Sequence, residues 1–268
     1  MHHSGSLARN LTFLSLVFLI ASQVGAAFSQ SAMDGVDLSS SDMTEAELGR
    51  DDIVAMLAQS TPVDLTRRKL NGIDLSGLDL SGAILRAARM NNINLEGAVL
   101  KGAILDQAWM LNAYLSGADL EAASLFQTQL IGADLSGANL RGARTAADFS
   151  RANLTGADFS GADFSADMKN QSMGLMRGVL RKANAEGANF AGANFMRADL
   201  EFSNFGGASF AGANLMAATL GGADFTGANV EGALFQDADL TSTRLVDLVG
   251  AREDQFASSR NLDRAFRK

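Results

Sequence analysis

The chain has 268 residues, of which 47% are apolar, so it is long enough and apolar enough to bury a core. Its formal net charge is -8, and the absence of any basic block argues against binding to a nucleic-acid backbone. It contains no Cys, and its only two His residues are His2 and His3, which excludes disulfides and thiolate chemistry and leaves no usual zinc site.

The N-terminus has the pattern of a secretory signal peptide, which we place at residues 1–27. Arg9 supplies a positive charge, residues 11–20 form a short apolar run, and small residues follow. Cleavage is expected near Ala26 to Ser29. The apolar run is shorter than the roughly 20 residues that span a bilayer, so an uncleaved membrane anchor is the alternative. We therefore expect an exported, periplasmic protein that contacts a membrane only if this segment is retained.

Residues 28–61 form an N-terminal segment in which one capping helix is predicted. Residues 44–47 have a capping-box pattern that marks the start of a helix. The apolar face of this helix would consist of Ile53, Met56 and Leu57. The helix should end before Pro62, because proline cannot continue it.

A five-residue repeat runs through residues 62–247. From Leu65 to Leu140 every fifth residue is Leu or Met, and after a one-residue slip the period continues at Phe149. The place two before each large residue is usually Ala, the place before it favours Asp or Asn, and the place two after it favours Gly. A period of five matches neither a helix nor a flat strand, so the unit must have a geometry of its own.

The unit Ala-(Asp/Asn)-(Leu/Phe)-X-Gly resembles that of the pentapeptide-repeat proteins, and the resemblance covers about residues 62–247. It implies an all-β solenoid, a right-handed quadrilateral parallel β-helix with four pentapeptides in each coil. Roughly 34 units would make eight to nine coils and a rod about 40 Å long, at about 4.8 Å per coil. With residues 20 apart stacked, Phe190 should lie over Phe210 and Phe205 over Phe225.

Two stretches depart from the repeat. Residues 165–178 break the motif and are interpreted as a bulge or a short loop, which is either a tolerated irregularity or a binding loop. Residues 248–268 are expected to form a C-terminal cap, because an open β-helix exposes strand edges. The side chains expected to pack over the last coil are Phe256, Leu262 and Phe266.

Apolar residues at outward places in the first half of the repeat predict a contact surface. They are Ile84, Ile104, Trp109, Leu111, Phe126 and Ile131. When the chain is folded into coils of 20 residues, these positions converge on one edge of the rod. An exposed apolar patch usually marks a contact. Three occupants remain open: a protein partner, a second copy of the chain in a homodimer, and the chain's own N-terminal segment.

These features predict no enzyme, no cofactor and no metal site, since each acidic residue before a Leu belongs to the motif and nucleophilic triads lack their residues. The first hypothesis is an exported scaffold with a structural or protein-interaction role and no nucleic-acid partner. The alternative, which the resemblance implies, is a DNA-mimicking inhibitor or protector of a DNA gyrase-type enzyme. It ranks second because Asp74 is followed one coil on by Asn94 and then by Tyr114, so the acidic columns are broken.

Overall fold

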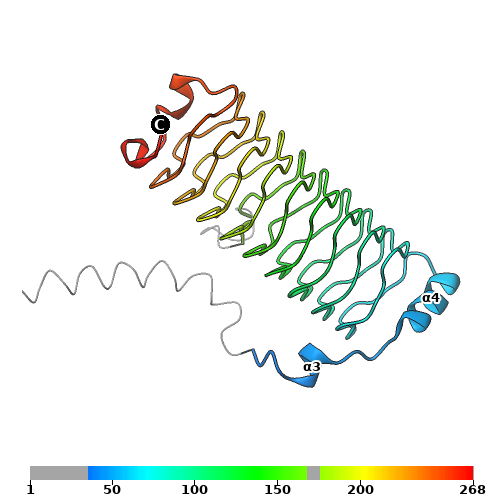
Figure 1. Ribbon diagram of the computed structural model, residues 1–268. Helices are drawn as coiled ribbons and strands as arrows, with labels where there is room; N and C mark the ends of the chain where they lie inside the picture. The colour runs from blue at the N-terminus through cyan, green and yellow to red at the C-terminus, as the bar shows by residue number, and fades with distance from the viewer. Residues whose placement is uncertain (1–35, 168–175, 268) are drawn as a thin grey trace, which may run out of the picture. The chain divides into compact units, whose positions relative to one another are not determined.

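The structure is a computed structural model that describes residues 36–167 and 176–267 (Figure 1). The chain divides into two compact units, Met1–Ser40 and Ser41–Lys268. In the first unit the Asp37 carboxylate accepts hydrogen bonds from the amide and the hydroxyl of Ser39. The expected signal peptide, residues 1–27, lies outside the described residues. In the ranges that are described, no helix has the length and apolar character needed to cross a membrane.

The second unit is a β-solenoid in which the chain winds through successive coils with four short faces (Figure 1). Parallel bridges join residues 20 apart, so four columns of bridges run along the solenoid. We number the faces 1 to 4 by the first bridge residue of each, which are Asp64, Lys69, Asp74 and Asp79. The predicted right-handed quadrilateral β-helix is confirmed.

Each pentapeptide contributes one face and one corner. On the face, the backbone pairs with the neighbouring coils, as where the amide of Leu105 donates to the carbonyl of Ser124 at 2.7 Å. The corner closes with a hydrogen bond from the amide of Ala103 to the carbonyl of Leu100 at 3.0 Å, and Gly102 between them has a φ of 61°. Glycine adopts this φ without a steric penalty, which explains the last place of the motif.

The interior is filled by the Ala and the large residue of each unit. Leucines dominate the first coils, and stacked phenylalanine rings fill the later ones. The ring centroids of Phe190 and Phe210 are 5.0 Å apart, as are those of Phe205 and Phe225. Both stacks agree with the prediction from the 20-residue spacing.

Before the C-terminal cap, the length of the coil changes at two places. Gln129 pairs with Asp148, a step of 19 residues, and Asp148 pairs with Val179, a step of 31 residues. The long step carries the irregular stretch 165–178, of which residues 168–175 are not described. Phe164 and Phe195 still stack across this step at 4.3 Å. The core is therefore continuous across this step.

Between residue 36 and the first coil the structure has two helices, α3 (Ser41–Thr44) and α4 (Arg50–Gln59). The expected helix start at 44–47 is wrong, because Thr44 ends α3 and α4 begins after Gly49. The amide of Glu47 donates to the carbonyl of Lys69 at 2.9 Å, which holds the residues between the helices along the first coil. α4 does have the predicted apolar face, with Ile53 fully buried against the core. It lies at the N-terminal end of the solenoid (Figure 1).

Two short 3-10 helices follow the last coil, η1 (Glu253–Phe256) and η2 (Leu262–Arg264). The Phe256 ring lies 4.8 Å from that of Phe235, and the Gln255 side chain donates to two carbonyls of the last coil. Leu262 packs against the core, as expected. Phe266 does not, since it is 54% exposed. Its backbone bonds to the last coil in ladder fashion, which turns its side chain outward.

Candidate interaction surface

The solenoid interior is a single apolar core, which runs from Ile53 to Phe256. In the part of the chain that the structure describes, no group of three or more His, Cys, Asp or Glu residues is placed to hold a metal ion. The inward places are nearly the same in every coil. Stretches of the solenoid therefore differ from one another in the side chains at their outward places and corners.

The six predicted contact residues divide between two places. Ile84, Ile104 and Phe126 lie on face 1 and at the corner that follows it. Leu111 and Ile131 lie at the next corner, between faces 2 and 3, and Trp109 lies on face 2 between the two groups. Leu111 is only 9% exposed, and the five others are half-buried. The residues therefore border face 2 on both sides instead of meeting at one bare edge.

The chain itself covers part of this surface near Phe126. The Arg144 guanidinium lies 4.0 Å from the centre of the Phe126 ring and pairs with Asp167 at 3.8 Å. The Gln127 side chain donates to the sulfur of Met176. Asp167 and Met176 belong to the two described ends of the irregular stretch. This stretch therefore leaves and rejoins the wall against the predicted contact surface.

The corner between faces 2 and 3, hereafter the 2–3 corner, binds part of the N-terminal segment over the first two coils. The Asn71 side-chain amide donates to the carbonyls of Asp42 and Glu45, at 3.2 and 2.8 Å. That of Asn91 donates to the carbonyl of Met43 at 3.1 Å. Both asparagines are buried, and the oxygen of each accepts a backbone amide of the next coil. Residues 41–48, hereafter the docked segment, are thus one occupant of this corner.

The docked segment is acidic and lies on basic side chains of the first coils. Asp42 pairs with Lys69 at 2.6 Å and with Arg89 at 3.5 Å, and Glu47 pairs with Arg68 at 3.3 Å. The hydrogen bond from Lys69 lowers the pKa of the Asp42 carboxyl, and the same bond raises the pKa of Lys69. Because these ion pairs are exposed to solvent, each contributes little to the stability of the fold. They do explain why acidic residues suit these places in the docked segment.

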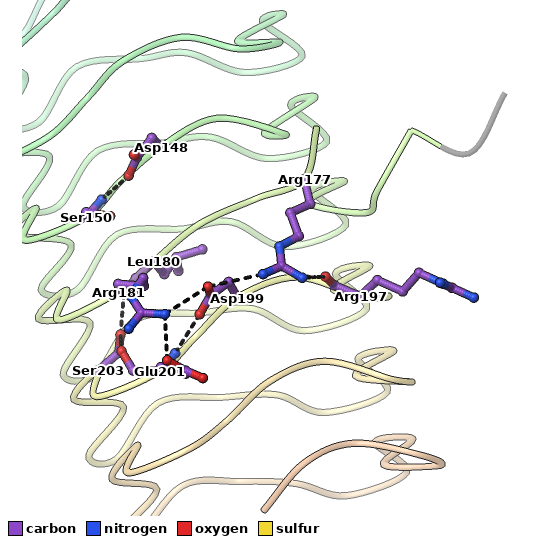
Figure 2. A network of polar contacts seen from close by, with 9 residues as sticks. All are labelled: Asp148, Ser150, Arg177, Leu180, Arg181, Arg197, Asp199, Glu201 and Ser203. Carbon is purple, nitrogen blue, oxygen red and sulfur yellow. Dashed lines mark hydrogen bonds and ion pairs between the residues drawn. The ribbon is translucent and has the colours of Figure 1, made fainter. Parts of the chain in front are cut away.

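A second charged cluster lies on face 2 beyond the irregular stretch (Figure 2). Asp199 is 5% exposed, and one of its oxygens accepts hydrogen bonds from Arg177 and from Arg181, at 3.2 Å each. Arg181 also pairs with Glu201 at 2.5 Å, and Arg177 donates to the carbonyl of Arg197 at 3.3 Å. The cluster therefore fastens the end of the irregular stretch to the wall.

Burial raises the pKa of two other carboxyls in this cluster. For Asp148 burial is the main cause, opposed by the hydrogen bond that its carboxylate accepts from Ser150. For Glu201 burial and the charge of Asp199 raise the pKa, and Arg181 opposes them. Removing an arginine would leave negative charge without a partner in a partly buried place. The arginines therefore stabilise this part of the wall.

Three features of this surface are missing from the predictions made on the sequence. Asn71 and Asn91 stand directly after a large residue and 20 residues apart, a spacing that the sequence displays. The pairing of Asp199 with two arginines depends on where the irregular stretch rejoins the wall, which no local pattern reveals. Phe202 is 56% exposed and stands two places after a large residue, where the repeat favours Gly. That last exception is a signal that sequence reasoning can use.

Comparison with known proteins gives a clear match for the repeat. The profile described as pentapeptide repeats finds eight copies, and its matches cover residues 63–142, 145–166 and 179–247. No curated protein sequence gives a significant match.

Several solved structures are similar in fold. HetL from Nostoc sp. strain PCC 7120, a pentapeptide-repeat protein involved in heterocyst differentiation regulation, is 24% identical, with 76% of this chain and 92% of HetL covered and a TM-score of 0.34. Full-length QnrB1, a plasmid-mediated fluoroquinolone resistance protein, is 19% identical over 75% of this chain and 93% of its own, with a TM-score of 0.38. A thylakoid-lumen pentapeptide-repeat protein of Arabidopsis thaliana is 26% identical over 68% and 70%, with a TM-score of 0.14.

Proposed function

This chain belongs to the pentapeptide-repeat family, and on that premise we propose that it is an exported, non-enzymatic scaffold that binds protein through its outer surface. The observation that carries the proposal is the contrast between inside and outside. The interior is one apolar core, mainly of Ala with Leu, Met or Phe, while large apolar and charged side chains replace the usual polar residues at some outward places. A rigid solenoid with a varied surface is suited to recognition.

Export is proposed from the sequence of the first 27 residues. A positive charge, a short apolar run and small residues follow one another in the order of a secretory signal peptide. We place the mature protein in the periplasm, with retention of the segment as a membrane anchor as the alternative. The compartment also restricts the partners, because a cytoplasmic enzyme is out of reach of an exported scaffold.

The surface bordering face 2 is proposed as the site of contact with a partner or with a second copy of the chain. Ile104 and Trp109 present large apolar side chains at outward places, and each is half-buried in the free chain. The described ends of the irregular stretch, at Asp167 and Met176, lie against the same surface, and loops on rigid scaffolds commonly carry binding. Aromatic residues at such places contribute most of the free energy of association in many interfaces.

The second candidate function is that of a DNA mimic that inhibits or protects a DNA gyrase-type enzyme. It is favoured by the rod-like stack of coils and by the net charge of -8. The structure places Asp74, Asn94, Tyr114 and Asp134 on one column of face 3, so negative charge alternates with neutral side chains. A mimic of the DNA backbone needs regular charge. Compartment discriminates between the two readings.

The test is to express the full chain with its native N-terminus in a Gram-negative host, to fractionate the cells, and to apply intact-mass analysis and light scattering. We expect a shortened, periplasmic protein that associates and becomes monomeric with Ile104→Asp or Trp109→Asp. Val99→Asp is the matched control, since Val99 holds the equivalent outward place on face 4. A full-length cytoplasmic protein would contradict export and favour the DNA-mimic reading. A processed monomer that is indifferent to both substitutions would exclude self-association and leave only a separate partner.

A further inference from the structure

Phe202 is an exposed aromatic residue held in an unfavourable backbone conformation. Its φ is 61°, and it is the only aromatic among the described non-glycine residues with positive φ. The corner imposes this φ on whichever residue stands there, since Arg151 and Lys182 share it, but a bulky aromatic residue rarely adopts the region. The ring lies over Gly222 of the next coil, where an added Cβ would be 2.7 Å from Cδ1 of the ring. The glycine therefore makes room for a ring that the repeat itself does not need.

Basic residues share the 2–3 corner with this ring. Arg151 and Lys182 occupy the same corner place on the two preceding coils, which are joined by backbone hydrogen bonds from Arg151 to Arg181 at 2.9 Å and from Lys182 to Glu201 at 3.0 Å. The Arg181 guanidinium lies 5.9 Å from the centre of the Phe202 ring. We call Arg151, Arg181, Lys182 and Phe202 the Phe202 corner. Of these cations, Arg181 is paired with Asp199 and Glu201, so Arg151 and Lys182 supply the positive charge that this corner offers to a partner.

The first two coils show what the same corner can bind. There the docked segment places Asp42 on Lys69 and Glu47 on Arg68, at 2.6 and 3.3 Å. Its Met43 side chain is 5% exposed, so one apolar residue is buried between the acidic ones. An acidic peptide with an apolar anchor is thus held by basic side chains on face 2 and by asparagines at the 2–3 corner. The Phe202 corner also combines cations with apolar surface, but its cations stand at the corner itself, and the Phe202 ring is exposed.

We propose that the Phe202 corner is a docking surface for an acidic, extended segment of a partner protein, with an apolar side chain of that segment packed on the Phe202 ring. This surface lies on later coils than Ile104 and Trp109, so it goes beyond the contact surface of the proposed function and is independent of it. A short peptide fits better than a nucleic acid, because Arg181 already pairs with Asp199 and Glu201, and Arg151 and Lys182 are too few cations for a phosphate backbone.

The test measures peptide binding to the full chain by fluorescence anisotropy. The probe is a labelled peptide with the sequence of residues 40–48, Ser-Ser-Asp-Met-Thr-Glu-Ala-Glu-Leu, and the comparison peptide carries Asn and Gln in place of Asp and Glu. We expect the acidic peptide to bind about tenfold or more tightly than the neutral one. Phe202→Asn and Lys182→Glu should each weaken binding by about tenfold or more. Arg67→Glu is the matched control, since it makes a similar charge change at a positive-φ corner of the first coil.

Phe202→Asn also separates docking from a structural role, because Asn accepts positive φ better than Phe. A midpoint of thermal unfolding that is unchanged or raised, together with weakened binding, supports docking. A lower midpoint would show that Phe202 serves the fold, and would overturn the proposal. So would failure of the acidic peptide to bind, equal binding of the neutral peptide, or binding that both variants leave unchanged. Binding to phosphatidylglycerol vesicles in place of the peptide, lost in both variants, would overturn it in favour of a lipid surface.

Discussion

The 2–3 corner has two differently equipped stretches on one backbone geometry. Over the first two coils, Asn71 and Asn91 direct their side-chain amides at the docked segment, and the corner is covered. Over the later coils, Arg181 and Phe202 occupy the corner places, and the ring of Phe202 is exposed. The coils themselves are joined in the same way in both stretches.

The difference teaches that the side chains one and two places after the large residue decide what this corner binds. Asparagine at the first of these places satisfies carbonyl groups of an extended segment that lies beside it. Arginine and an aromatic ring at the same places present charge and apolar surface to the solvent. The fold therefore supplies a regular support, and a few replaced corner residues give each stretch its own binding properties.

The largest expected effect comes from Arg181→Ala at the later stretch. It leaves Asp199, whose side chain is 8% exposed, with one arginine and leaves Glu201 unpaired. We expect the free energy of unfolding to fall by about 3 kcal/mol, as when a buried ion pair loses one partner. The measurement is chemical denaturation. The control is Arg141→Ala, whose ion pair with Asp158 spans 3.9 Å on the surface. Equal losses in both variants would show that the cluster is not a stabilising unit.

Asn91→Ala should release the docked segment from the first coils. The substitution leaves the carbonyl of Met43 and the amide of Leu111 without their partner, which costs about 2 kcal/mol. Hydrogen exchange of the Glu47 amide, which bonds to the first coil, reports the release. Asn94→Ala is the control on the same coil, because Asn94 makes only an exposed turn bond. Unchanged protection of Glu47 in Asn91→Ala would mean that the asparagines do not hold the segment.

As the pH falls, the later stretch should become more stable and the contacts of the docked segment should become less stable. The pKa of Asp42 is lowered by Lys69, so its contribution to stability is present above the ordinary aspartate pKa and is lost as the pH falls through the lowered value. The pKa values of Asp148 and Glu201 are raised by burial, so the folded state takes up their protons first and gains stability as the pH falls through those values. Hydrogen exchange against pH should therefore show the later stretch stabilised before the docked segment is released. Release of the segment at the higher pH would contradict this order.

The smallest effect is expected from Gly222→Ala under the Phe202 ring. Gly222 has a φ of 69°, so alanine costs about 1 kcal/mol there whatever its surroundings. Gly212→Ala is the matched control, with a φ of 66° and open space at its Cβ. The difference between the two variants measures the displacement of the ring and should be a few tenths of a kcal/mol, because a side chain can swing aside. In a Phe202→Asn background the difference should vanish.

Most of the fold follows from the sequence, because the five-residue period states which residue of each unit points inward. The period also predicts the stack of Phe190 on Phe210, since residues 20 apart meet in neighbouring coils. The helix start at Thr44 could not be predicted correctly, because contacts with the first coil override a local capping pattern. For the same reason, the sequence did not reveal that ends of the irregular stretch lie against Phe126.

The candidate surface is less predictable than the fold, because it depends on which side chains cover one another. The apolar residues around Trp109 are identifiable, but their half-burial is not. Phe202 is identifiable from its place in the unit, yet the sequence alone does not show that the ring rests on Gly222. The residues at outward places follow no repeat, so the contacts and burial of each side chain can be determined only in the folded coil.

The most direct measurement of what the later stretch binds is zero-length carbodiimide crosslinking of the acidic peptide to the full chain, mapped by mass spectrometry. Carbodiimide joins a carboxylate to an amine that it touches, and the chain has only five lysines, at 69, 101, 169, 182 and 268. The Asp42–Lys69 pair at 2.6 Å provides an internal positive control. We predict that the peptide is recovered on Lys182, with the internal crosslink intact. Recovery of the peptide on other lysines, with Lys182 unmodified, would contradict the account.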